Sequence, residues 1–143
     1  MVFPVIIQNE KNDCGPAALM MIFKYYDIAC SWNDIYEGCR YLGNAITLYD
    51  LGKFAQKKGM MTLAVRCSIE DLKEKVPLPV IAFLKKGHFI VIYRITKNYV
   101  WTADPYSGRV RYLYDDFAKR WFLENSMTGV VLALEKQEQK NNE

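Results

Sequence analysis

Residues 8–26, QNEKNDCGPAALMMIFKYY, decide how the first part of this chain folds. Four apolar residues after Cys14 recur at i, i+3, i+4 and i+7, which predicts an amphipathic helix. They are Leu19, Ile22, Phe23 and Tyr26. Asp13 can cap this helix, and Pro16 fits its first turn because no intrahelical donor is needed there. A thiol at a helix start meets unpaired amides and the positive end of the helix dipole, which favour thiolate, so Cys14 is a candidate nucleophile.

The chain contains one histidine, His88. A cysteine nucleophile that uses an imidazole as its base must therefore use this residue. Each of the two also has a purely structural interpretation, since free cysteines are commonly buried and a histidine in an apolar strand can belong to the core. The sequence around Cys14 favours the catalytic interpretation for both.

The composition is that of one folded domain. The 143 residues are 51% hydrophobic and 24% charged, and a net charge of +3 with scattered basic residues indicates no nucleic-acid partner. The four cysteines lie at irregular intervals without a CxxC pair, so the sequence predicts no zinc site, no disulfide framework and no other cofactor. Free thiols favour a reducing, cytoplasmic setting. The sequence shows neither a signal peptide nor an apolar run of membrane-spanning length.

Helical patterns fill the first half of the chain and strand patterns the second, which indicates an α+β fold with N-terminal helices packed on a C-terminal antiparallel sheet. Hydroxyl and acidic residues three positions apart predict helix starts at Ser31, Thr47 and Ser68, and Gly59 closes the helix after Thr47. The predicted strands cover 62–66, 79–84, 88–95, 99–104, 110–114 and 129–135, with a helix over 114–121. The later strands are expected to form a meander.

The spacing of two strands bears on the candidate site, because His88 begins one and Asp104 ends the next. A three-residue turn with Asn98 in a left-handed conformation would pair Ile95 with Tyr99. Counting back from that pair places Asp104 one diagonal step from His88, within reach of a hydrogen bond.

Several of these features resemble one family. The segment Gln8…Asp13-Cys14-Gly15-Pro16-Ala17-Ala18-Leu19, the strand beginning at Gly87-His88 and the motif Asp104-Pro105-x-x-Gly108 are similar to the double-glycine leader peptidases. These are the papain-like cysteine peptidase domains of bacteriocin-processing, peptidase-containing ABC transporters. The helix from Thr47 through Ala55 to Gly59 also resembles the family's TLxxL…A…G pattern. One departure is Asp27, where the family has glycine, and a left-handed conformation is expected there.

The resemblance implies a role for each motif residue. Cys14 would attack the scissile carbonyl as thiolate, His88 would donate a proton to the departing amine, and Asp104 would orient His88. Gln8 would donate a side-chain N–H to the oxyanion, together with the backbone N–H of Cys14. Outside the resemblance, Asp104 before Pro105 can simply begin a turn, and Gln8 can close an apolar strand.

The family also implies a substrate and a setting. Its members cut precursor peptides after a Gly-Gly pair, and the leader resembles an amphipathic helix that docks in a shallow apolar groove. That groove is expected on the sheet half, with Tyr93, Tyr99 and Trp101 as candidates. Residues 1–135 would form the peptidase domain and residues 136–143 a polar linker or tail. Transporter membrane and ATPase domains would be partners on the cytosolic face of a membrane, and a stand-alone enzyme is the alternative.

Two other functions stay open. A non-catalytic leader-docking module of an export transporter would share the fold but is expected to lack the cysteine. A papain-like acyltransferase or amidase would share the Cys–His–Asp chemistry but would need an acceptor or cofactor pocket, for which the sequence gives no sign.

Overall fold

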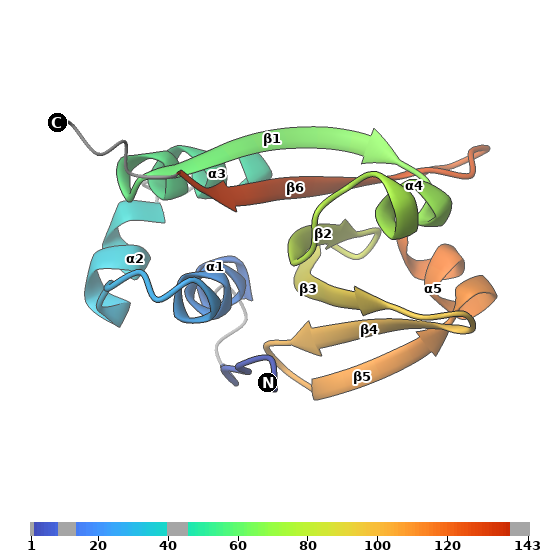
Figure 1. Ribbon diagram of the computed structural model, residues 1–143, viewed down its shortest axis with the longest axis horizontal. Coiled ribbons are helices and arrows are strands. Elements are labelled where there is room, and N and C mark those ends of the chain that lie inside the picture. Colours follow the sequence, from blue (N-terminus) through green and yellow to red (C-terminus); the bar gives the residue numbers. More distant parts are fainter. Residues whose placement is uncertain (1, 9–13, 40–45, 138–143) are drawn as a thin grey trace, which may run out of the picture.

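The computed structural model describes residues 2–8, 14–39 and 46–137, whose arrangement Figure 1 shows. Three helices come first, and strands with two further short helices follow. In chain order the elements are α1 (Cys14–Tyr25), α2 (Trp32–Cys39), α3 (Leu48–Lys57), β1 (Met60–Cys67), α4 (Ile69–Glu74), β2 (Val80–Leu84), β3 (His88–Ile95), β4 (Tyr99–Asp104), β5 (Gly108–Leu113), α5 (Tyr114–Trp121) and β6 (Gly129–Lys136). The predicted α+β class is confirmed. None of the helices in the described ranges is long and apolar enough to cross a bilayer.

The helices begin where the sequence predicts, because side chains bind the amides that a first helical turn leaves unpaired. At α3, Thr47 Oγ1 accepts from the Asp50 amide (3.2 Å), and Asp50 Oδ2 accepts from the Thr47 amide (2.9 Å). The same reciprocal box starts α4 at Ser68, and Ser31 caps α2 through its Oγ. The predicted cap at Asp13 lies outside the described residues.

Helix α1 differs from the one-sided helix that the sequence predicts. Every residue from Cys14 to Phe23 is buried, because the sheet, α2 and α3 enclose this segment. A helix that is apolar around its whole circumference is a core helix. The predicted left-handed residue after it is confirmed, since Asp27 has a φ of 56°.

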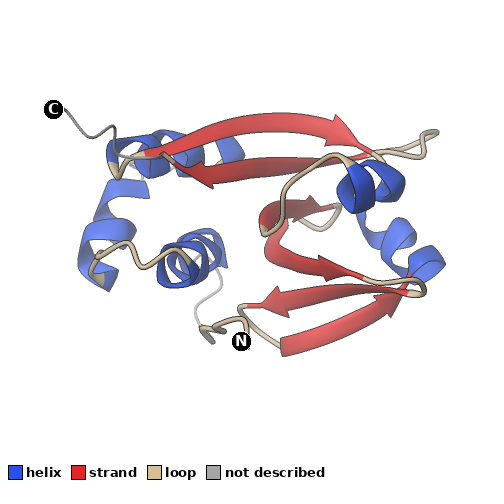
Figure 2. Cartoon of the chain, in the orientation of Figure 1, coloured by secondary structure: helices blue, strands red, loops and turns tan. Residues whose placement is uncertain are grey.

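All six strands form one antiparallel sheet in the order β1-β6-β2-β3-β4-β5. Strands β2 to β5 form the predicted meander, but β6 does not continue it. Helix α5 carries the chain back across one face of the sheet, burying Phe117 and Trp121, and β6 then inserts between β1 and β2. Helices α1 and α3 pack on the opposite face, so that the sheet lies between two groups of helices (Figure 2).

The turn between β3 and β4 differs from the prediction. Ile95 pairs with Val100, not with Tyr99. The Thr96 amide donates to the Tyr99 carbonyl (3.0 Å), which continues this shifted pairing and leaves Lys97 and Asn98 at the tip of the turn. Asn98 does not adopt a left-handed conformation. The predicted three-residue turn and the expected conformation of Asn98 are therefore wrong, because the two strands pair one residue out of the predicted register next to the turn.

A β-bulge at Tyr93 restores the predicted register beyond the turn. The pairing shifts by one residue between Ile92 and Arg94, and from there Val91 faces Ala103 as the sequence predicts. The one-residue shift next to the turn is therefore compensated before the strands reach His88 and Asp104.

Candidate active site

Cys14 is the first residue of α1 and lies against the start of β3. The next residue, Gly15, lies close to β3, because a Cβ at that position would be in van der Waals contact with the Phe89 ring, at 3.4 Å. Phe89 directly follows His88 in β3. The start of α1 therefore lies beside the start of β3, where the thiol of Cys14 and the imidazole of His88 form a side-chain hydrogen bond.

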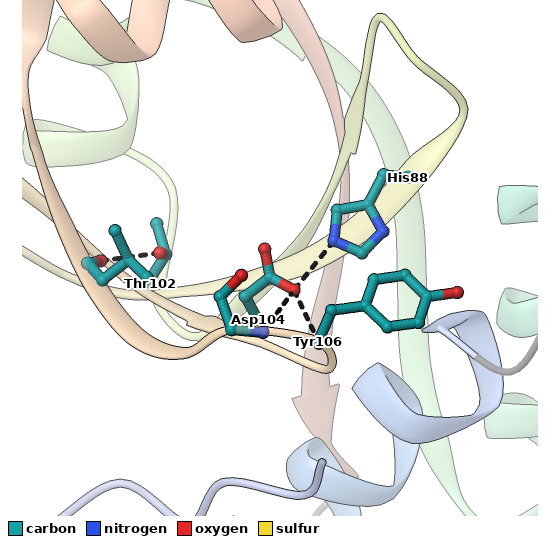
Figure 3. A network of polar contacts seen from close by, with 6 residues as sticks. His88, Thr102, Asp104 and Tyr106 are labelled. Atoms are coloured by element: carbon teal, nitrogen blue, oxygen red, sulfur yellow. Dashed lines mark hydrogen bonds and ion pairs between the residues drawn. The ribbon is translucent and has the colours of Figure 1, made fainter. Parts of the chain in front are cut away.

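His88 is held by Asp104. The distance from His88 Nε2 to Asp104 Oδ1 is 2.9 Å, and the two side chains are only 19% and 10% exposed (Figure 3). The same carboxylate oxygen accepts from the backbone amides of Tyr106 (2.8 Å) and Ser107 (3.4 Å), which fixes its position in the β4–β5 turn. Because Nε2 faces Asp104, Nδ1 is the ring nitrogen available to Cys14.

The charges of the three groups support one another. Burial opposes the thiolate of Cys14, but His88 and the amides of Phe89 and Gly15 more than offset it, so the pKa of Cys14 is lowered. Burial likewise opposes the imidazolium, but Asp104 and Cys14 raise the pKa of His88 to about 9. The pKa of Asp104 is lowered, because His88 and the turn amides outweigh its burial. A thiolate beside an imidazolium is the state that a cysteine nucleophile needs near neutral pH.

The other three cysteines lie in different environments. Burial raises the pKa of Cys39 to about 12 and that of Cys67 to about 11. The pKa of Cys30 is also raised, mainly by burial. Cys14 is thus the thiol with the environment of a reactive cysteine, and the other three have that of structural thiols.

A cleft of about 700 Å³ opens beside Cys14 and His88, a volume typical of ligand sites. Its lining comes from α1, the β2–β3 turn, β4, β5 and α5. The lining residues are Cys14, Leu84, Lys85, Lys86, Gly87, His88, Asp104, Tyr106, Tyr112, Lys119 and Arg120. Among the described residues, no group of three or more His, Cys, Asp or Glu side chains is placed to hold a metal ion.

Gln8 lies next to this site through its backbone. Its amide donates to the carbonyl of Pro105 (2.6 Å), which ties the N-terminal segment to the residue after Asp104. The structure thus brings Cys14, His88 and Asp104 into contact and places Gln8 at the same turn. The role of the Gln8 side chain stays a prediction.

The sequence did not identify two parts of the site. Tyr106 stacks on His88 with the ring centroids 4.9 Å apart and an interplanar angle of 18° (Figure 3). Its position in Asp104-Pro105-Tyr106 is the signal that could have suggested this contact. Lys119 and Arg120 line the cleft from α5, and only the tertiary packing of that helix brings them there.

Comparison with known proteins shows the same fold. A double glycine motif protease from an AMS/PCAT transporter, in complex with the leader peptide, superposes with a TM-score of 0.84 at 25% identity, covering 94% of this chain and 91% of that one. The peptidase domain of Streptococcus ComA, a bi-functional ABC transporter involved in a quorum sensing pathway, gives 0.82 at 22% identity, covering 95% and 100%. The predicted papain-like fold is confirmed.

The sequence shows the family within that fold. Residues 2–139 match the Peptidase C39 family, and the chain belongs to it. It is 30% identical over 133 residues to the lactococcin-G-processing and transport ATP-binding protein LagD of Lactococcus lactis subsp. lactis, covering 90% of this chain but 18% of LagD. It is also 31% identical to an uncharacterized protein of Methanothermobacter marburgensis, covering 94% of this chain and 89% of that protein.

Proposed function

We propose that this chain is a cysteine endopeptidase that removes the leader from a precursor peptide by cleaving after a Gly-Gly pair. The observation that carries the proposal is the contact of Cys14, a thiol with a lowered pKa at a helix start, with a histidine held by a buried carboxylate. Membership of a peptidase family supports the class of reaction.

The proposed reaction proceeds in two steps. The Cys14 thiolate attacks the carbonyl carbon of the second glycine, and the oxyanion that forms accepts hydrogen bonds from the Gln8 side chain and the Cys14 amide. His88 then protonates the departing amine as the C–N bond breaks, which leaves a thioester on Cys14. A water molecule, deprotonated by His88, attacks the thioester and releases the leader with a free carboxylate. Asp104 stabilises the imidazolium in the first step.

The relatives support the proposed substrate and setting. LagD is a lactococcin-G-processing transporter, and the AMS/PCAT protease binds a leader peptide. We therefore propose a bacteriocin or lanthipeptide precursor with an amphipathic helical leader as substrate, cleaved on the cytosolic side and coupled to ABC-transporter export. The chain spans less than a fifth of LagD but most of the Methanothermobacter relative, so transporter domains in the same protein and a separate peptidase are the two arrangements to compare.

A non-catalytic leader-docking module is the second candidate. The same fold and the relatives' substrates would suit it. The presence of Cys14, and the lowering of its pKa by His88, favour the enzyme, because docking alone needs neither group.

Mass spectrometry of a synthetic leader–core peptide containing Gly-Gly tests this proposal. Wild-type protein and a Cys30→Ala control are expected to cut after the second glycine, whereas Cys14→Ala is expected to bind the peptide and leave it whole. Cys30 is a suitable control because its raised pKa marks it as a thiol of another kind. Cleavage by Cys14→Ala would disprove the assigned nucleophile, and binding without cleavage by the wild type would favour the docking module.

A further inference from the structure

The cleft beside Cys14 has a strongly basic wall. Four cationic side chains line it, and they are called the basic rim below: Lys85, Lys86, Lys119 and Arg120. All four are exposed. Among the described residues that line the cleft, Asp104 is the acidic one, and it is already paired with His88.

The basic rim is built from two segments far apart in the sequence. The Lys85 amide donates to the Arg120 carbonyl (2.9 Å), which ties the β2–β3 turn to the last turn of α5. Arg120 is held in place, since its guanidinium donates to the Asp116 carbonyl (2.9 Å) and lies 4.9 Å from the Tyr112 ring. The backbone therefore holds together the two segments that carry the four cations.

The cations of the basic rim have no carboxylate partners among the described residues. In the described part of the chain, none of the four lies within 4.0 Å of an acidic side chain. Like charges that share one wall repel each other, and an anion placed between them relieves that repulsion. The wall is therefore complementary to a negatively charged group that enters the cleft.

We infer that the basic rim selects peptides that carry a carboxylate side chain close to the scissile bond. This inference rests on the proposed peptidase function, because a peptide whose carbonyl reaches Cys14 must lie in the cleft that the basic rim lines. An Asp or Glu a few residues from the glycine pair then lies among the cations. The basic rim acts on both binding and association rate, since a cleft of one charge steers an oppositely charged ligand.

The solvent exposure of the four cations limits the expected preference for a carboxylate peptide. An exposed ion pair changes an equilibrium by roughly 1.5- to 5-fold, so an Asp peptide is expected to be cut about fivefold faster than its Asn counterpart when it faces two or more cations. The preference is expected to fall as salt is raised, because the Debye length shortens from about 10 Å at 0.1 M to about 3 Å at 1 M.

A charge-reversal experiment tests the inference. Asp, Asn or Lys is placed in turn at the three positions before and the three positions after the glycine pair of a synthetic substrate. For each peptide, kcat/KM is measured with the wild type, with Lys86→Glu/Lys119→Glu and with Lys57→Glu/Lys73→Glu. The last variant carries the same change of net charge on exposed residues outside the cleft. Binding of each peptide to Cys14→Ala is measured in parallel.

The expected result is an Asp-over-Asn preference of about fivefold at one position or more, which reverses in favour of Lys in Lys86→Glu/Lys119→Glu and persists in the control. Ratios within twofold at every position, or a preference that the Lys86→Glu/Lys119→Glu variant retains, would overturn the inference. If the wild type cuts no peptide, the proposed peptidase function fails. In that case the charge preference is decided by the affinities of the Asp, Asn and Lys peptides for Cys14→Ala. The same ratios, about fivefold in support and within twofold against, then apply to binding.

Discussion

Asp104→Asn isolates the charge that Asp104 contributes to the site. The substitution keeps an oxygen that can accept from the Tyr106 amide, so the β4–β5 turn is expected to remain. What it removes is the negative charge 2.9 Å from His88 Nε2. Because that charge stabilises the imidazolium, the pKa of His88 is expected to fall.

The structure sets the size of this change. Burial lowers the pKa of His88, but Asp104 and Cys14 raise it overall from 6.5 to about 9. That rise corresponds to roughly 3 kcal/mol in favour of the imidazolium. Asp104 is the first of the groups that raise the value, and a carboxylate at this distance accounts for about one to two units. The pKa of His88 is therefore expected to fall by that amount in Asp104→Asn.

Nuclear magnetic resonance measures the change directly. The chain has one histidine, so protein labelled with 13C at histidine Cε1 gives one imidazole signal to follow through a pH titration. The same shift is expected in the activity. Loss of the imidazolium ends the reactive state as pH rises through the pKa of His88, so the alkaline limb of kcat/KM moves to lower pH in the variant.

Asp115→Asn is the matched control, because Asp115 is exposed and does not line the cleft. Its His88 titration is expected to match that of the wild type. An unchanged His88 midpoint in folded Asp104→Asn would refute the reasoning, since it would mean that the carboxylate does not stabilise the imidazolium.

Two further predictions concern the thiols and the packing of α5. A short pulse of iodoacetamide at pH 7 is expected to modify Cys14 before Cys39 and Cys67, whose pKa values of about 12 and 11 keep them protonated, and peptide mapping that finds equal labelling would contradict this. Gly129→Ala is expected to lower the free energy of unfolding by about 1–3 kcal/mol, because the added Cβ would lie 2.2 Å from the Trp121 ring. An unchanged urea midpoint would show that the ring moves aside without cost.

Local patterns predicted most of the elements, because the relevant interactions are local. A capping box such as Thr47 with Asp50 lies within one helical turn, and strand alternation is visible within a few residues. What the sequence did not predict depends on contacts between distant segments. The insertion of β6 between β1 and β2, and the complete burial of α1, follow from packing that no local window contains.

The candidate site shows the same division. The motif around Cys14 and the single histidine identified two of its residues, and the strand register predicted that Asp104 lies near His88. That geometry was predicted from the wrong turn, since the strands pair one residue out of the expected register next to the turn and the bulge at Tyr93 compensates for this shift. The basic rim could not be predicted, because the contact of Lys85 with Arg120 joins residues on different elements.

The enclosure of α1 ties the chemistry of the site to the integrity of the whole domain. Cys14 is the first residue of a helix that is buried over most of its length, so a shift of this helix would disturb the sheet and the neighbouring helices. The position of the nucleophile is therefore coupled to the packing of the core. A molecule in the population either keeps its core and its reactive geometry together or loses both in one cooperative transition.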